Sequence, residues 1–158
     1  ARGAGRGVPI PERPRGVEIG KGQVIESGER VALVGYGYGA GLAAEAADLV
    51  ADTVRARPTV VNARFCKPID AGLIRQLAQR HDLIVTIEDH QASAGFGSAV
   101  LEVLEDMPVR VMRVGLPDRF VDHGKRELLL DEVGLTPGAI AARVADALRR
   151  PDRLIAEG

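Results

Sequence analysis

Several residue types are scarce in this sequence, and each scarcity excludes a class of protein. The single cysteine, Cys66, cannot form an internal disulfide, which favours a reducing compartment. The net charge is −1, so no general basic field is present to hold nucleic acid. No apolar run approaches the roughly 18 residues of a membrane helix. The sequence therefore predicts a cytoplasmic protein with neither a nucleic acid nor a membrane as its partner.

Metal-binding patterns are also scarce. The three histidines and the one cysteine show no ligand spacing, so we predict no metal site within this chain. A Ser-His-Asp hydrolase would need a Gly-x-Ser-x-Gly turn, and the sequence has none.

The 158 residues suit one domain of ordinary size with flanking segments. Residues 1–16 are rich in glycine and proline and carry four arginines against one acid, so we predict a linker arm there, either solvated or lying on a partner surface. The folded domain is expected over 17–150 and a tail over 151–158. The chain begins with alanine, which fits either a trimmed chain or the carboxy-terminal part of a longer protein.

Apolar strands alternate with amphipathic helices along the folded part. Strands are predicted at 30–36, 59–63, 83–87 and 109–114, with one or two weak edge strands in 17–27. Helices are predicted at 40–55, 71–79, 96–106, 125–133 and 137–149. This alternation indicates a three-layer α/β/α fold with a mainly parallel, mixed five-stranded sheet.

The stretch from Val60 to Asp70 contains a strand end, a charged corner and a helix start. Asp70 is a suitable cap for the helix that follows it. Arg64 lies in the corner, where we expect it to pair with Glu88 at the end of a neighbouring strand.

Glu88, Asp89 and His90 close the third strong strand, and the carboxyl ends of parallel strands are where α/β proteins place their chemistry. Consecutive strand residues point to opposite faces, so Glu88 and Asp89 are not expected in one site. Three roles remain open for Glu88: general acid or base, acceptor of backbone N–H bonds from the next loop, or partner of Arg64. We treat Arg64, Glu88 and His90 as residues of an active-site rim or of the scaffold.

Two glycine-rich turns precede helices. The first, Gly35–Gly41, has an alanine where a dinucleotide fingerprint needs its third glycine, and no ribose-binding acid follows, so it predicts close packing of strand and helix. The second, Ser93–Ser98, contains no lysine or arginine. It predicts either a capped helix start with Ser93 as the cap or an anion site on backbone N–H groups.

Six stretches in this order carry a resemblance to a known family: Ala1–Gly3, Glu18–Gly22, Asn62–Asp70, Thr86–His90, Gly95–Ser98 and Gly115–Phe120. They are similar to the carboxy-terminal third of the 1-deoxy-D-xylulose 5-phosphate synthase family, within the transketolase superfamily. Transketolases and the E1 β subunits of 2-oxoacid dehydrogenases share a looser form of the pattern and remain an alternative, as does a noncatalytic interaction domain.

The resemblance implies a homodimeric thiamine diphosphate and Mg²⁺ enzyme that condenses pyruvate with glyceraldehyde 3-phosphate, releasing CO2, and so supplies isoprenoid and thiamine biosynthesis. It implies that the preceding domains hold the cofactor and the catalytic residues, so this chain alone is expected to be inactive. Its expected role is dimer support and completion of the active-site rim.

Two single residues follow from the resemblance. Arg2 occupies the position that binds the phosphate of the aldehyde substrate, a role that suits a planar guanidinium. Ala94 stands where the family usually has glycine, so we expect a backbone conformation at 94 that alanine adopts readily.

Overall fold

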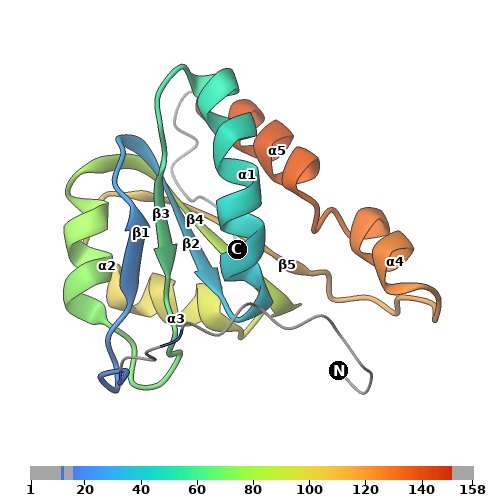
Figure 1. The fold of residues 1–158 in the computed structure, drawn as a ribbon, viewed down its shortest axis with the longest axis horizontal. Coiled ribbons are helices and arrows are strands. Elements are labelled where there is room, and N and C mark those ends of the chain that lie inside the picture. Colours follow the sequence, from blue (N-terminus) through green and yellow to red (C-terminus); the bar gives the residue numbers. More distant parts are fainter. Residues whose placement is uncertain (1–11, 13–15, 151–158) are drawn as a thin grey trace.

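A five-stranded mixed sheet in the order β1-β3-β2-β4-β5 is the middle layer of the computed structural model, which describes residue 12 and residues 16–150 (Figure 1). Its strands are β1 Gln23–Glu26, β2 Arg30–Tyr36, β3 Thr59–Asn62, β4 His81–Gln91 and β5 Arg110–Leu116. The helices are α1 Tyr38–Val54, α2 Ala71–Ala78, α3 Phe96–Val103, α4 Arg126–Glu132 and α5 Pro137–Arg149. Only β1 is antiparallel to its neighbour; the other pairings are parallel.

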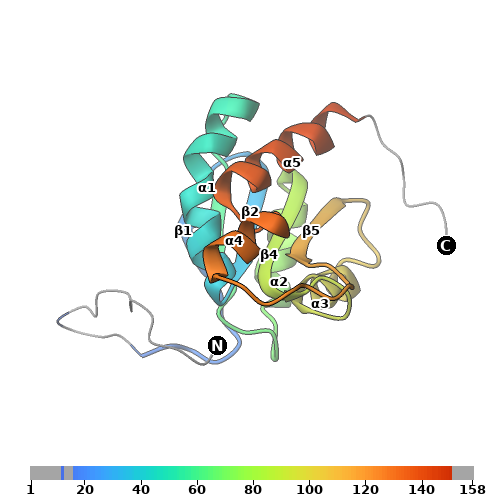
Figure 2. The ribbon, with the colours of Figure 1, turned by 90° about the vertical axis from the view of Figure 1, so that its right-hand side faces the viewer.

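Helices cover both faces of the sheet. α1 and α5 lie side by side in Figures 1 and 2 and pack on one face, together with the buried Leu135. α2 and α3 pack on the other face, where Phe96 is fully buried. The three-layer α/β/α fold with a mainly parallel five-stranded sheet is therefore confirmed.

Alternation along β4 divides its side chains between the two layers. Leu83, Val85 and Ile87 face α1 and α5, whereas Ile84 packs toward α2 and α3. Thr86 is buried on the same side as Ile84, and its hydroxyl has no hydrogen-bond partner within the described part of the chain. Both faces of β4 are covered, which explains why its sequence is an almost continuous apolar run up to Ile87.

Capping residues confirm two predicted helix starts. Asp70 accepts a hydrogen bond from the N–H of Leu73 at 3.1 Å, and its other oxygen accepts one from Gly22 N at 3.1 Å. The α2 start is thereby tied to the segment that leads into β1. Thr136 caps α5, which begins with Pro137 as its first helical residue.

The turn from β2 into α1 requires glycine because backbones meet there. A Cβ on Gly39 would lie 2.0 Å from the carbonyl oxygen of Ile87, and one on Gly35 would lie 2.3 Å from the carbonyl oxygen of Gly39. Gly37, with φ 57° and ψ −124°, adopts a conformation open almost only to glycine. The predicted close packing of strand and helix is confirmed.

Several element bounds differ from the prediction. β4 runs four residues beyond Ile87 because its pairing with β5 resumes at Gln91, opposite Leu116. α3 ends at Val103, three residues short, and Pro108 follows soon after. The segment 17–27 contains a single strand, β1, over Gln23–Glu26. Most of the predicted linker arm and the whole predicted tail lie outside the described residues.

Exposed ion pairs join the surface elements. Arg57 lies between Glu26 of β1 and Asp48 of α1, and hydrogen bonds to both carboxylates raise its pKa. Arg75 of α2 donates two hydrogen bonds to Asp106, which hold the pKa of that carboxyl below its ordinary value. Within residues 16–150, none of the helices is long and apolar enough to span a bilayer.

Candidate functional site

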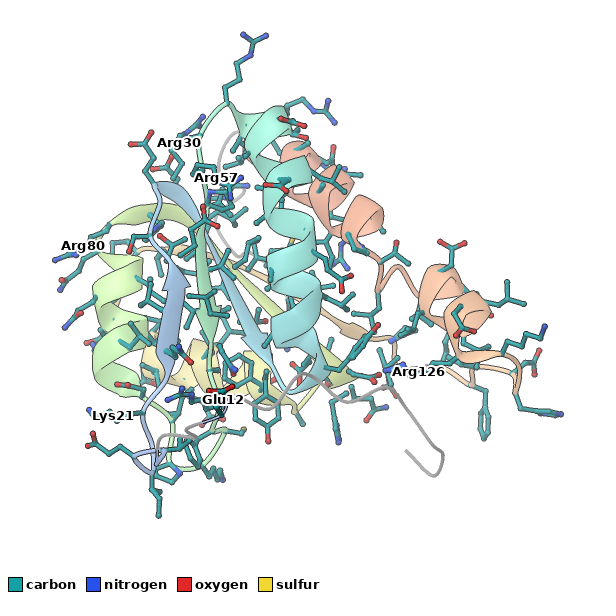
Figure 3. The ribbon with its side chains drawn as sticks, viewed as in Figure 1. Glu12, Lys21, Arg30, Arg57, Arg80 and Arg126 are labelled. Atoms are coloured by element: carbon teal, nitrogen blue, oxygen red, sulfur yellow. The ribbon has the colours of Figure 1, made fainter. Side chains whose placement is uncertain are left out.

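The carboxyl ends of four parallel strands lie along one edge of the sheet, which we call the carboxyl edge. β2, β3, β4 and β5 end there, at Tyr36, Asn62, Gln91 and Leu116. In Figure 3 this edge is the lower one, and Arg30, at the start of β2, marks the opposite edge. The predicted rim residues Arg64, Glu88 and His90 all belong to this edge or to the loops that leave it.

Glu88 is buried and fully engaged in binding the start of α3. Its side chain is 1% exposed. One carboxylate oxygen accepts the N–H of Phe96 at 2.7 Å, and the other accepts the N–H of Gly97 at 2.8 Å. A carboxylate at this end also opposes the positive end of the helix dipole. Of the three roles considered for Glu88, the structure supports the acceptor of backbone N–H bonds, and this is a scaffold role.

The same contacts correct the interpretation of the Ser93–Ser98 loop as an anion site. The N–H groups of Phe96 and Gly97, which an anion would need, are already bonded to Glu88. Ser93 is not the cap either, because the residue in the capping position is Gly95, whose missing side chain leaves room for the Glu88 carboxylate. The protein thus supplies its own anion to this helix start.

The prediction that Ala94 has a backbone conformation that alanine adopts readily is wrong. Its φ is 59°, in the left-handed region where a Cβ is disfavoured. Glycine adopts this conformation without strain, so the residue expected from the family pattern is also the one that the backbone favours here.

The predicted pairing of Arg64 with Glu88 is wrong. The Arg64 guanidinium donates instead to the side-chain oxygen of Gln23 in β1. The reason is the strand order: β2 lies between β3 and β4, so the end of β3 neighbours β1 and not β4. Arg64 also has φ 57°, and its N–H donates to Asn62 Oδ1 at 2.9 Å, so the corner turns toward β1.

His90 is exposed and lies between two residues that bind a later segment of the chain. We call this segment, residues 117–132, the arm; it consists of a loop after β5 and the helix α4 and is distinct from the linker predicted over residues 1–16. Gln91 donates to Asp118 Oδ1 at 3.0 Å. Asp89 accepts a hydrogen bond from Arg126 Nη2 at 2.7 Å. His90 therefore occupies the base of the arm, apart from the buried carboxylate of Glu88.

Arg126 also contacts an aromatic ring. Its guanidinium carbon lies 4.2 Å from the ring centroid of Tyr38, at the start of α1. Such a cation–π contact adds to the ion pair with Asp89. Within the arm itself, Arg119 donates to Glu132 Oε1 at 3.0 Å and so joins the loop to α4.

Sequence reasoning missed these contacts. Asp89 and Arg126 lie 37 positions apart, and no local pattern links them. The apolar pattern ends at Ile87 and gave no signal for the extension of β4, which carries Asp89 and Gln91 into reach of the arm.

Two further site predictions concern a phosphate ligand and metal binding. Arg2, the predicted phosphate ligand, lies outside the described residues. Within the described part of the chain, the histidine, cysteine, aspartate and glutamate side chains form no group of three that suits a metal ion.

The chain resembles full-length synthases over nearly its whole length. It is 45% identical over 155 residues to 1-deoxy-D-xylulose-5-phosphate synthase of Heliobacterium modesticaldum, covering 96% of this chain and 24% of that protein. It is 43% identical over 157 residues to the probable synthase 2, chloroplastic, of Oryza sativa subsp. japonica, covering 95% of this chain and 22% of the relative. The chain thus spans about a quarter of the length of these relatives.

A solved structure and a family description agree with this. The structure, described as "Split gene transketolase, inactive beta4 tetramer", superposes with a TM-score of 0.75 at 35% sequence identity, over 85% of this chain and 45% of the other. Residues 20–140 match the family described as "Transketolase, C-terminal domain". On the evidence of fold, family match and identity together, this chain belongs to the transketolase C-terminal domain family, and the relatives named above are 1-deoxy-D-xylulose-5-phosphate synthases.

Proposed function

We propose that this chain is the carboxy-terminal domain of a 1-deoxy-D-xylulose-5-phosphate synthase. The full-length protein joins pyruvate to glyceraldehyde 3-phosphate, which gives 1-deoxy-D-xylulose 5-phosphate and CO2, the first step of the non-mevalonate isoprenoid pathway. The observation that carries this proposal is 43–45% identity over 95–96% of the chain to two such synthases. It favours the synthase over a 2-oxoacid dehydrogenase E1 β subunit and over a noncatalytic interaction domain.

The proposed cofactors, thiamine diphosphate and Mg²⁺, are assigned to the part of the enzyme that precedes this chain. Bound thiamine diphosphate supplies the carbanion chemistry of such enzymes. The described residues of this chain do not fit the cofactor: the N–H groups at the α3 start are bonded to Glu88, and no acidic cluster suits Mg²⁺ in this part of the chain. We therefore assign no catalytic step to residues 16–150.

The proposed work of this domain is to support the assembled enzyme, which we infer to be a homodimer, and to complete the rim of its active site. The buried Glu88 junction supports this role because it fixes the loop that leaves the carboxyl edge. We place the enzyme in the cytoplasm; the rice relative is named as chloroplastic.

Formation of 1-deoxy-D-xylulose 5-phosphate by the full-length protein tests the proposal. With thiamine diphosphate and Mg²⁺, we expect equal amounts of product and CO2 from the two substrates. Release of CO2 without the five-carbon phosphate, or turnover of a ketose phosphate donor in place of pyruvate, would contradict the synthase assignment. A variant of the protein that ends before residue 1, and so lacks this domain, is expected to be inactive. The 158-residue chain alone is also expected to be inactive.

Arg2 is the proposed ligand for the phosphate of glyceraldehyde 3-phosphate. In the full-length enzyme, Arg2→Ala is expected to raise the KM for this aldehyde by roughly 10- to 150-fold, which corresponds to about 1.5–3 kcal/mol for a hydrogen bond to a charged group. The KM for pyruvate should change little. Arg6→Ala removes the same charge from the same segment and serves as the control. Equal increases for both substrates, or an equal effect of the two variants, would exclude the phosphate role.

A further inference from the structure

The base of the arm is attached to the domain through polar side chains at the carboxyl edge. It is held by the hydrogen bond from Gln91 to Asp118 and by the ion pair of Arg126 with Asp89. None of the residues of α4 is fully buried. Figure 1 shows α4 and its loop projecting to one side of the sheet, beyond the end of α5. The arm therefore has its own outward surface.

Two large apolar side chains of the arm face away from this domain. Phe120 is 101% exposed, the highest value among the exposed large apolar residues, and Leu128 in α4 is 67% exposed. On the inner side, Leu130 of the arm and Val133, which directly follows it, pack against the core. The outward residues thus contribute little packing within this domain, whereas Leu130 shows that α4 has apolar contacts where the core is available.

Exposed aromatic and leucine side chains on a projecting element are typical of contact surfaces, where aromatic residues are enriched and a polar rim surrounds them. Asp118, Arg119 and Lys125 supply polar groups around Phe120 in the sequence of the arm. We propose that the arm is a docking element, with Phe120 and Leu128 as anchors, and that it binds the preceding part of the same polypeptide. This inference rests on the proposed function, which requires such a preceding part.

The position of the chain entry favours this occupant. Glu12, the first described residue, lies at the carboxyl edge in Figure 3, as does Arg126 of the arm, whereas Arg30 marks the opposite edge. The chain covers 22–24% of the length of its synthase relatives, so about three quarters of such a protein is available to lie against it. The first described residue therefore lies at the same edge from which the arm projects.

The edge strand β1, at one side of the sheet, offers a poorer surface for the same purpose. β1 also exposes Val24 and Ile25, but its register shifts between Val24 and Glu26, and Glu26 is paired with Arg57. A short, irregular and charged edge strand is the arrangement that proteins use to prevent contact along a sheet edge.

Hydrogen exchange on the full-length protein tests the proposal. Three proteins are compared: the wild type, a double variant that carries both Phe120→Ser and Leu128→Ser, and the control Leu49→Ser. Leu49 is 43% exposed on α1, eleven residues and about 16 Å along the helix from Tyr38. We expect exchange in residues 117–132 at least tenfold faster in the double variant, together with faster exchange in one segment that precedes this chain. The control should leave both regions unchanged.

Phe120 is fully exposed and Leu128 is 67% exposed within this domain, so faster exchange in a preceding segment indicates a contact outside it. Unchanged exchange in both regions would overturn the proposal. Light scattering at two protein concentrations tests the alternative that the arm binds a second copy of the protein. If the double variant dissociates the oligomer, and exchange in the arm becomes faster on dilution, the arm binds a second copy and the proposal is wrong. Product formation by the wild type is measured in parallel, so failure of the proposed function is recognised separately.

Discussion

Glu88 and Asp89 are consecutive carboxylates at the end of β4, and the pleat of the strand sends them to opposite faces of the sheet. Glu88 is 1% exposed and accepts two backbone N–H groups of α3. The Asp89 side chain is 34% exposed and is paired with Arg126 of the arm. The chemical group is the same, yet one carboxylate completes a buried junction and the other holds a surface segment.

Burial decides the energetic weight of the two carboxylates. Removing a buried acceptor leaves its donors unbonded and away from water, which costs about 1–3 kcal/mol for each group. An exposed ion pair is screened by water and salt and contributes about 0–1 kcal/mol. The junction is therefore expected to be part of the cooperative core, and the arm to be free to respond to whatever lies beyond the domain.

Replacing Glu88 should produce the largest effect. Glu88→Ala leaves the N–H groups of Phe96 and Gly97 unbonded and creates a cavity, so we expect a loss of about 3–5 kcal/mol in the free energy of unfolding. Glu88→Gln keeps one acceptor oxygen, and we expect about half that loss. Urea unfolding of the 158-residue chain provides the measurement, with an unchanged slope as the sign that only stability has changed. A loss below about 1 kcal/mol for Glu88→Ala would mean that the buried Glu88 contributes no more to stability than the exposed Asp89.

Filling the space beside the Glu88 carboxylate should be the next largest effect. A Cβ on Gly95 would lie 2.3 Å from Glu88 Oε2 and 2.3 Å from the carbonyl oxygen of Gln91. Gly95→Ala is therefore expected to cost about 1–3 kcal/mol through overpacking. Gly41→Ala is the control, because its Cβ would meet no atom within 4 Å and alanine favours the interior of α1. Equal melting temperatures for the two variants would contradict the close approach.

Features that depend on nearby residues are where sequence reasoning succeeds. The strands, the helices and the Asp70 cap follow from patterns that span a few residues, and α5 begins and ends where its pattern predicts. The bonds from Glu88 to the next loop were one of the predicted alternatives, because strand end and helix start are adjacent in the chain.

Contacts that depend on strand order were not predictable in this way. Arg64 was paired with Glu88 on the assumption that their strands are neighbours, but β2 lies between them. Asp89 and Arg126 meet only because β4 continues beyond its apolar run and the chain returns after β5. A single sequence gives the faces of each strand but not the order of the strands, so the arm and its contacts required the structure.

Relief of strain at Ala94 should produce a smaller effect of opposite sign. Alanine with φ 59° carries a cost of about 1–2 kcal/mol that glycine does not, whereas glycine loses about 0.5–1 kcal/mol more entropy on folding. We expect Ala94→Gly to stabilise the chain by about 0.5–1 kcal/mol, measured as a higher urea midpoint. Ala92→Gly is the matched control in the same loop. Ala92 itself does not have a positive φ, so this substitution should be destabilising. Destabilisation by Ala94→Gly would show that the loop adopts another conformation.

The ion pair of Asp89 should have the smallest effect. In a double-mutant cycle of Asp89→Ala and Arg126→Ala in the 158-residue chain, we expect a coupling energy of about 0.2–1 kcal/mol. It should decline further in about 1 M salt, where the screening length falls to about 3 Å. Tyr38→Leu removes the cation–π contact without touching the carboxylate and separates the two contributions of Arg126. A coupling above about 2 kcal/mol would mean that the arm is fixed as firmly as the Glu88 junction. A small value leaves the arm weakly held at its base, so its position in the full-length protein is set by the surface on which Phe120 and Leu128 come to lie.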